Sequence, residues 1–200
     1  MHPEKWKSLF QSRDNSHGIV TIRTDRAVSP RTGDAHDFFV LETPPWVNII
    51  PVTADRRVVM VRQYRHGTGE VTLEIPGGIV EKEDSPESGA LRELEEETGY
   101  TSSSVSLLGA VHPNPAIQDT VCYTYLALNA IRVGEQRLDE KEDIEVVLRP
   151  LEDIPSLILK GYITHALVLA AFYRFYMELP AERLETAIAN PCSSLKLLDK

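Results

Sequence analysis

Apolar and polar residues alternate along several short stretches of this chain, which is the pattern of strands with one buried face. Near the N-terminus, residues 17–28 and 36–42 show this alternation, and the turn-forming residues 29–34 separate them. We therefore expect a small antiparallel sheet in this region. Residues 1–17 are mostly polar, and we expect them to be partly loose.

Strand patterns continue through the middle of the chain, after Pro44 and Pro45, which break any helix. Residues 66–72 contain two glycines and are expected to form a loop. Runs rich in Val, Ile, Leu and Tyr predict further strands at 47–52, 58–65, 73–78, 105–111, 120–131 and 144–151.

Two segments have helical patterns. Ser85 is a suitable N-cap, and Gly99 a suitable C-terminal residue, for a helix that starts at Pro86. The second helical segment, 151–179, is divided by Gly161 into a short helix and a long one.

This order of elements predicts an α/β fold. We expect a mixed β-sheet sandwiched between helices, with the first helix and the last on opposite faces, preceded by a small N-terminal antiparallel β extension. The expected divisions are an extension at 1–45, a main domain at 46–180 and a C-terminal tail at 181–200.

Composition narrows the possible classes of function. The chain has 200 residues, of which 42% are hydrophobic, and this suits one domain with a real core. Its net charge of −9 argues against a nucleic-acid-binding surface, although bound cations would still allow an anionic substrate. Cys122 and Cys192 give no disulfide framework, and neither a signal peptide nor a membrane-spanning apolar run is evident. We expect a cytoplasmic protein.

The first expected helix carries three glutamates on one face. Glu93, Glu96 and Glu97 have i, i+3, i+4 spacing, which keeps them within an arc of about 100°. Carboxylates this close repel one another unless a cation lies between them, and Mg²⁺ or Mn²⁺ prefers oxygen ligands. A solvated acidic face is the simpler alternative. However, no lysine is interspersed among these glutamates, and Arg92 could brace one of them, so the pattern favours a metal site.

The stretch around these glutamates resembles the Nudix box, the family pattern R-E-U-x-E-E-x-G-U preceded by a glycine and a glutamate, with U bulky and apolar or aromatic. One position differs, because Asp84, with Glu83 beside it, stands where the family has its first glutamate. In the family that residue mainly supports the loop. The residues in register are Gly78, Asp84, Arg92, Glu93, Leu94, Glu96, Glu97, Gly99 and Tyr100. The resemblance implies the Nudix fold and hydrolysis of a phosphoanhydride.

Weaker signals resemble one branch of that family. The segments VRQYR, LEIPGG and HPNPAIQD, the last of which contains Pro115, look like the ADP-ribose pyrophosphatases and nucleoside-diphosphate-sugar hydrolases. The resemblance implies hydrolysis of a sugar nucleotide such as ADP-ribose or GDP-mannose, with Mg²⁺ or Mn²⁺, to a nucleoside monophosphate and a sugar phosphate. It also implies a homodimer built through the N-terminal extension.

Four residues are candidates for substrate binding. Trp46 could stack on a nucleobase or fill the core. Arg62 and Arg65 could bind phosphates, or each could form a surface salt bridge. Their spacing places them on opposite faces of a strand, so at most one faces the site unless the strand ends or bulges there. Glu74, just before a Pro-Gly-Gly turn, could contribute to the site or simply meet an arginine.

Further residues are candidates for catalysis and metal binding. The backbone carbonyl of Gly77 is a possible metal ligand beside the three glutamates, of which Glu97 also counts as catalytic. In the resembled branch, an acidic loop such as 139–143 carries the catalytic base or an additional ligand. Register with the following strand makes Glu142 the first candidate and Glu140 the second. The alternative is a solvated acidic loop. We expect this loop to be mobile until substrate and metal bind.

Three other functions stay open. One is a housecleaning hydrolase of nucleoside triphosphates or dinucleoside polyphosphates. Another is a Nudix-fold module that senses a nucleotide without cleaving it, although such modules tend to lose box glutamates and all three are present here. The last is an acidic interaction surface without a ligand.

Overall fold

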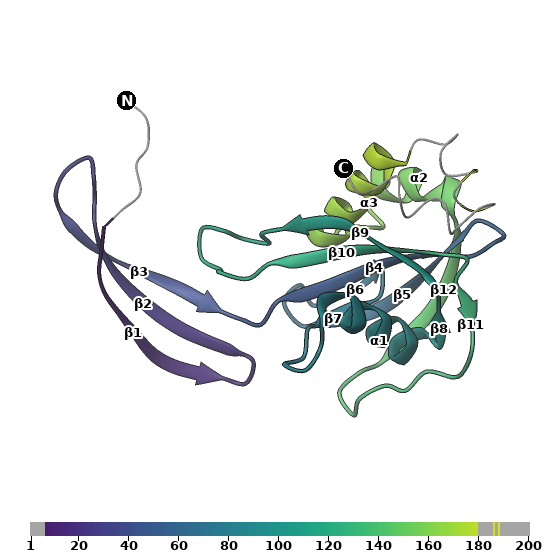
Figure 1. Ribbon diagram of the computed structural model, residues 1–200, viewed down its shortest axis with the longest axis horizontal. Helices are drawn as coiled ribbons and strands as arrows, with labels where there is room; N and C mark the ends of the chain where they lie inside the picture. The colour runs from purple at the N-terminus through teal and green to yellow at the C-terminus, as the bar shows by residue number, and fades with distance from the viewer. Residues whose placement is uncertain (1–6, 180–185, 187, 189–200) are drawn as a thin grey trace. The chain divides into compact units, whose positions relative to one another are not determined.

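The computed structural model describes residues 7–179, 186 and 188, and these fall into two compact units (Figure 1). One unit consists of the chain up to Pro44 together with His112–Val121. The other consists of Pro45–Val111 and the chain from Cys122 onward.

The first unit is built on an antiparallel sheet of β1 (Lys7–His17), β2 (Val20–Val28) and β3 (Ala35–Glu42), in that order. It confirms the expected N-terminal antiparallel extension. The expectation of loose residues is wrong for 7–17, which pair with β2 along its whole length. Lys7 to Gln11 are exposed, so no buried face imposes apolar alternation on this part of the strand.

Residues 112–121 join the first unit through hydrogen bonds. The Leu41 N–H donates to the Ile117 carbonyl at 2.7 Å, and the Thr120 hydroxyl donates to the Pro44 carbonyl at 2.7 Å. No local sequence pattern indicated this return of the chain, because the partners are far apart in sequence.

The second unit contains a seven-stranded sheet. Its strands are β4 (Trp46–Val52), β5 (Arg57–Arg65), β6 (Glu70–Glu74), β7 (Gly77–Ile79), β9 (Ser104–Val111), β10 (Cys122–Leu128) and β12 (Ile144–Pro150). The order is β12-β5-β4-β10-β9, with β6 beside β5 and β7 beside β4. Strand β10 runs parallel to β4 and the other pairs are antiparallel, so the sheet is mixed. A separate small sheet pairs β8 (Tyr100–Thr101) with β11 (Ile131–Arg132).

The helices of this unit begin and end at recognisable signals. They are α1 (Pro86–Thr98), the 3₁₀ helix η1 (Leu151–Asp153), α2 (Ile154–Leu159) and α3 (Ala166–Glu178). As expected, the Ser85 hydroxyl caps α1 by accepting from the Ser88 N–H at 3.1 Å. Gly99 ends α1 with a φ of 72° and donates its N–H to the Glu95 carbonyl at 2.8 Å.

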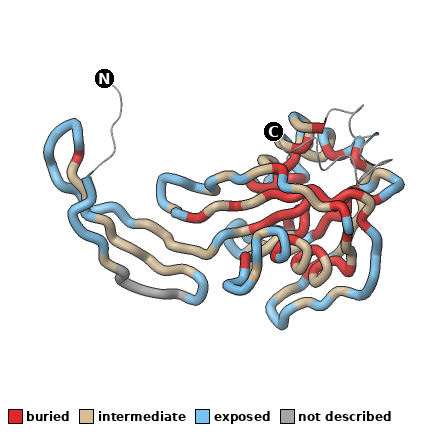
Figure 2. Tube along the Cα trace, viewed as in Figure 1, coloured by how far each residue is buried: buried red, intermediate tan, exposed pale blue. Residues whose placement is uncertain are grey.

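Two hydrophobic clusters hold α1 and α3 on opposite faces of the sheet (Figure 1). Phe172 of α3 belongs to the larger cluster, which includes Met60 of β5. Leu94 of α1 belongs to the other, with Ile49 of β4 and Tyr125 of β10. The buried residues follow the central strands between the two helices (Figure 2). The expected mixed sheet between helices is therefore confirmed.

Several element boundaries differ from the sequence expectation. Residues 70–72 lie in β6 and not in a loop. The strand expected at 73–78 is interrupted around Pro76, which has no N–H to give to a ladder, and so it divides into the end of β6 and β7. Residues 160–165, expected to be helical apart from Gly161, form a connection between α2 and α3 in which Gly161 has a φ of 74°. The strand expected at 120–131 is likewise divided, into β10 and β11.

Within the part of the chain that the structure describes, every helix is too short or too polar to traverse a lipid bilayer.

Candidate active site

Helix α1 buries two of its three aligned glutamates. Glu93 and Glu97 lie one turn apart and are 9% and 4% exposed, whereas the Glu96 side chain is 34% exposed. A solvated acidic face is therefore the wrong description of Glu93 and Glu97. Burying two neighbouring carboxylates costs free energy unless partners or a cation compensate their charge.

The two glycines of β7 allow the backbone to pass directly over these glutamates. A Cβ at Gly78 would overlap the carboxylate of Glu93, and one at Gly77 would overlap the carbonyl of Val47. The N–H of Gly77 donates to Glu97 Oε2 at 3.0 Å. The lack of a side chain at Gly78 thus lets β7 approach α1, and at Gly77 it lets β7 pack closely on β4. The Gly77 carbonyl as a metal ligand stays a prediction.

Arg92 braces the exposed edge of the site. Its Nε donates to Asp84 Oδ2 at 2.9 Å, and its Nη1 donates to Glu96 Oε2 at 2.8 Å and lies 3.1 Å from Glu93 Oε1. Its Nη2 donates to the Ile79 carbonyl at 3.1 Å. One guanidinium therefore ties the start of α1, the end of β7 and two glutamates together, and Asp84 supports it although it is shorter than the glutamate of the family pattern.

Burial is the main reason why the pKa of Glu93 rises to about 7 and that of Glu97 to about 8. Arg92 lowers the pKa of Glu93, and the charge of Glu142 raises it. The Gly77 N–H lowers the pKa of Glu97, and the charges of Glu93 and Glu142 raise it. The positive groups around Glu93 and Glu97 therefore do not offset the effect of burial on these two carboxylates.

This donor set fits a hard divalent cation. Mg²⁺ and Mn²⁺ prefer carboxylate oxygens, and a bound cation favours the ionised form that burial disfavours here. Among the residues that the structure describes, no three acidic, histidine or cysteine side chains are arranged to hold an ion as they stand. The fit thus rests on the chemistry and burial of the carboxylates.

The structure brings Glu142 to the glutamates of α1. Its charge raises the pKa of both Glu93 and Glu97, so Glu142 lies within electrostatic range of the two buried carboxylates. Glu142 is partly buried, whereas Glu140 is exposed. The Asp139 N–H donates to Glu142 Oε2 at 3.0 Å. Its partial burial and its effect on the two buried glutamates favour Glu142 over Glu140, and the role of either residue stays a prediction.

Arg65 approaches the same carboxylates from β5. Its Nε donates to Glu74 Oε1 at 2.9 Å and its Nη2 to Glu74 Oε2 at 2.8 Å. These hydrogen bonds raise the pKa of Arg65, and the charges of Glu97 and Glu142 act in the same direction. The guanidinium therefore lies close enough to the site to interact with its charges.

Arg62 lies on the opposite face of β5. It is opposite Leu73, which packs in the cluster on the α3 side, and its Nη1 lies 3.1 Å from Glu145 Oε2 in an exposed pair. The expected opposite orientation of the two arginines is confirmed. Of the two, the structure brings Arg65 and not Arg62 to the glutamates.

The NUDIX domain family matches residues 42–172 of this chain. That match covers more than half of the 200 residues and includes α1 and the whole seven-stranded sheet. The chain belongs to the Nudix family.

Relatives within the Nudix family support the expected branch. The ADP-ribose pyrophosphatase of Bacillus subtilis (strain 168) is 37% identical over 153 residues, which cover 76% of this chain and 82% of that protein. The ADP-sugar pyrophosphatase of Mus musculus is 34% identical over 145 residues, which cover 66% of each chain. These similarities confirm the resemblance to Nudix hydrolases of the ADP-ribose pyrophosphatase branch.

The Nudix fold is confirmed by a solved structure. A crystal structure of an ADP compounds hydrolase superposes with a TM-score of 0.80 and covers 92% of this chain and 99% of that one. The sequence identity is 20%, so this likeness is evidence for the fold alone.

Trp46 begins the first strand of the Nudix sheet. It is paired with Ile79 of β7 and Cys122 of β10, and its side chain is partly buried. This position is compatible with both base stacking and core packing, so both stay predictions.

Two contacts around the Nudix glutamates were not indicated by the sequence. The Thr72 hydroxyl donates to Glu74 Oε1 at 2.5 Å. The side-chain amide of Gln136 donates to the carbonyls of Glu97 and Ile144 at 2.7 and 2.9 Å. Strand alternation could have placed Thr72 on the same face as Glu74. Nothing local marks Gln136, because its partner on α1 is distant in sequence.

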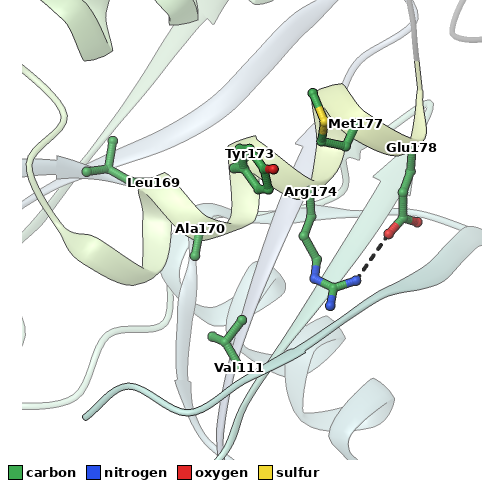
Figure 3. A pocket seen from close by; sticks show the side chains of 7 residues that line it. All are labelled: Val111, Leu169, Ala170, Tyr173, Arg174, Met177 and Glu178. Carbon is green, nitrogen blue, oxygen red and sulfur yellow. Dashed lines mark hydrogen bonds and ion pairs between the residues drawn. The ribbon is translucent and has the colours of Figure 1, made fainter.

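A groove of about 700 Å³ lies elsewhere on the Nudix domain, along α3 (Figure 3). Figure 3 shows Arg174 reaching toward Glu178, at 3.3 Å, beside Val111 of β9. The remaining lining residues are Leu169, Ala170, Tyr173 and Met177. None of the α1 glutamates lines this groove, so it is separate from the site described above.

Proposed function

We propose that this Nudix hydrolase cleaves the pyrophosphate bond of a nucleoside diphosphate sugar, such as ADP-ribose or GDP-mannose. The products are a nucleoside monophosphate and a sugar phosphate, and the reaction depends on Mg²⁺ or Mn²⁺. The observation that carries the proposal is the buried pair Glu93 and Glu97, with Arg65 and Glu142 beside it. The names of the Bacillus and mouse relatives support the substrate class.

Glu93, Glu96 and Glu97, with the Gly77 carbonyl, would hold the cation. When bound, it supplies charge neutralisation at the pyrophosphate oxygens and acidifies a water molecule. The protein's own contribution is the fixed position of these donors, since Arg92 and the Gly77 N–H orient the carboxylates from either side.

Glu142 is the proposed catalytic base. It accepts a proton from the attacking water while the water oxygen bonds to phosphorus and the phosphoanhydride P–O bond breaks. The electron pair of that bond leaves with the departing phosphate. Glu142 suits this role because it lies near Glu93 and Glu97 without being buried as they are. Glu140 is the alternative base.

Arg65 is the proposed phosphate ligand. Glu74 engages its Nε and Nη2, which fixes the plane of the guanidinium and directs Nη1 to another acceptor. Trp46, at the start of β4, is the proposed surface for the nucleobase. Arg62 is not included, because its charge pairs with Glu145 on the other face of the strand.

We also propose a homodimer formed through the first unit. Its sheet, with the turn between β1 and β2, exposes apolar side chains that a second copy would cover, namely Leu9, Phe10, Ile19, Phe38 and Phe39. Light scattering of the purified protein should give twice the chain mass of 22.4 kDa. Phe39→Ser should lower the measured mass toward that of a single chain. A monomeric wild type contradicts the proposed homodimer.

A cytoplasmic location is likewise proposed, and cell fractionation tests it.

The substrate class is tested by a panel of nucleotides with Mg²⁺ or Mn²⁺. ADP-ribose and other sugar nucleotides should release nucleoside monophosphate, and nucleoside triphosphates and dinucleoside polyphosphates should react far more slowly. Faster cleavage of triphosphates would favour the alternative function of a housecleaning hydrolase. Tight nucleotide binding without any cleavage would favour a sensing module.

A further inference from the structure

The loop that carries Glu142 is attached to the C-terminal end of α1. The last carbonyls of a helix have no partner within it. Here the Arg137 N–H donates to the Glu96 carbonyl at 2.8 Å, and the Val133 N–H donates to the Gly99 carbonyl at 2.8 Å. The segment from β11 to Glu142 thus starts from fixed points on the helix that carries the metal-binding glutamates.

The side chain of Gln136 makes the most informative of these attachments. Its Nε2 donates one hydrogen bond to the Glu97 carbonyl at 2.7 Å and another to the Ile144 carbonyl at 2.9 Å. Ile144 begins β12, two residues after Glu142. A single partly buried amide nitrogen therefore connects the backbone of Glu97 with the far end of the segment that holds Glu142.

We infer that Gln136 is a positioning residue that sets the distance between the Glu142 carboxylate and the Glu93–Glu97 pair. The hydrogen bonds of its side chain go to the backbone carbonyls of Glu97 and Ile144, so we take its effect to be one of geometry and not of charge. This inference rests on the proposed function, in which Glu142 takes the proton from the attacking water. A displacement of about 1 Å in such a group can lower the rate by about 100-fold.

Arg137 provides a matched control on the same loop. Its side chain lies 3.0 Å from Glu95 Oε1 in a surface pair and is 63% exposed. Glu95 points away from the other glutamates, so removal of the Arg137 charge should leave the position of Glu142 unchanged. Gln136→Leu and Arg137→Gln therefore separate the bridging contact from a general disturbance of the loop.

The experiment measures kcat and KM for ADP-ribose with Mn²⁺. Gln136→Leu should lower kcat by about 10- to 100-fold and change KM by less than about 3-fold, while Arg137→Gln should keep both within about 2-fold. Gln136→Met, which has a similar length and neither a donor nor a charge, should behave like Gln136→Leu and replaces it if the leucine variant does not fold.

A double-mutant cycle with Glu142→Gln identifies the route of the effect. If Gln136 acts through Glu142, Gln136→Leu should lower the residual rate of Glu142→Gln by less than about 2-fold. Equal losses in both backgrounds, or a wild-type kcat in folded Gln136→Leu, would overturn the inference while leaving the proposed function intact.

Hydrogen exchange provides a readout that needs no turnover. The backbone amides of residues 139–143 should exchange faster in Gln136→Leu than in Arg137→Gln. Equal exchange in the two variants overturns the inference. Absence of turnover in the wild type counts against the proposed function only, and exchange then decides whether Gln136 fixes the loop.

Discussion

Both carboxylate oxygens of Glu74 accept hydrogen bonds from the guanidinium of Arg65, at 2.9 Å from Nε and 2.8 Å from Nη2. The Glu74 side chain is 3% exposed, whereas that of Arg65 is 40% exposed. The buried carboxylate therefore holds the guanidinium of Arg65 in place, and the charges of Glu97 and Glu142 raise the pKa of this arginine further.

Replacement of this carboxylate should destabilise the fold. Glu74→Gln should lower the free energy of unfolding by about 2 kcal/mol, because Arg65 and Thr72 lose a charged acceptor in a buried position. Glu145→Gln breaks the exposed pair with Arg62 and should cost less than about 1 kcal/mol. Urea denaturation of both variants checks this, and equal losses contradict it.

The contribution of Glu74 should depend on pH. Burial by itself raises the pKa of Glu74, but hydrogen bonds from Arg65 and Thr72 and the charges of Arg65 and His165 bring it below 4.5. A carboxyl group with a lowered pKa stabilises the fold above its ordinary pKa, and this contribution is lost as the pH falls through the folded value. The stability gap between wild type and Glu74→Gln should therefore be full at neutral pH and narrow below 4.5. Denaturation at stepped pH measures the gap, and one that widens on acidification is the contrary result.

Gly78→Ala should damage the site more than the fold. The added Cβ overlaps the Glu93 carboxylate, which is the far end of a flexible side chain and can move aside. We expect kcat/KM to fall by about 100-fold and the free energy of unfolding by about 1 kcal/mol or less. Gly67→Ala is the control, since its Cβ meets nothing within 4 Å. A fully active Gly78→Ala protein would show that the position of Glu93 is unimportant.

Divalent cations should stabilise the folded chain through the α1 glutamates. At a concentration of Mn²⁺ about 100 times its Kd, the free energy of unfolding should rise by about 2.7 kcal/mol, and a chelator should remove the gain. Glu97→Gln should lose most of this gain, whereas Glu95→Gln, which breaks only a surface pair with Arg137, should keep it. Thermal unfolding with and without Mn²⁺ measures both, and the same gain in the two variants would place the cation elsewhere.

Local sequence signals predicted α1, its ends and the shared face of its glutamates well. Ser85 and Gly99 mark its ends, because Ser85 caps a free backbone N–H and Gly99 adopts a left-handed backbone conformation. The spacing of the glutamates determines which of them share a face. These features depend on residues within one or two turns of each other. They can therefore be predicted from the sequence without knowledge of the tertiary structure.

The sequence did not predict contacts that depend on distant segments. Strand β1 lacks an alternating pattern, because its described side chains are largely exposed. The contact of Glu97 with Gly77 depends on β7, whose three residues are too few to show a period. The position of Gln136 depends on two carbonyls from different elements, so no spacing along the chain marks it.

The most direct test of the central claim is the release of AMP from ADP-ribose by wild type and Glu97→Gln, with Mn²⁺ or with a chelator. Wild type should release AMP only with the cation, and folded Glu97→Gln should lose at least about 100-fold in kcat because the proposed metal ligand is gone. Wild-type rates in folded Glu97→Gln, or equal rates in the chelator, would contradict the assignment of the site.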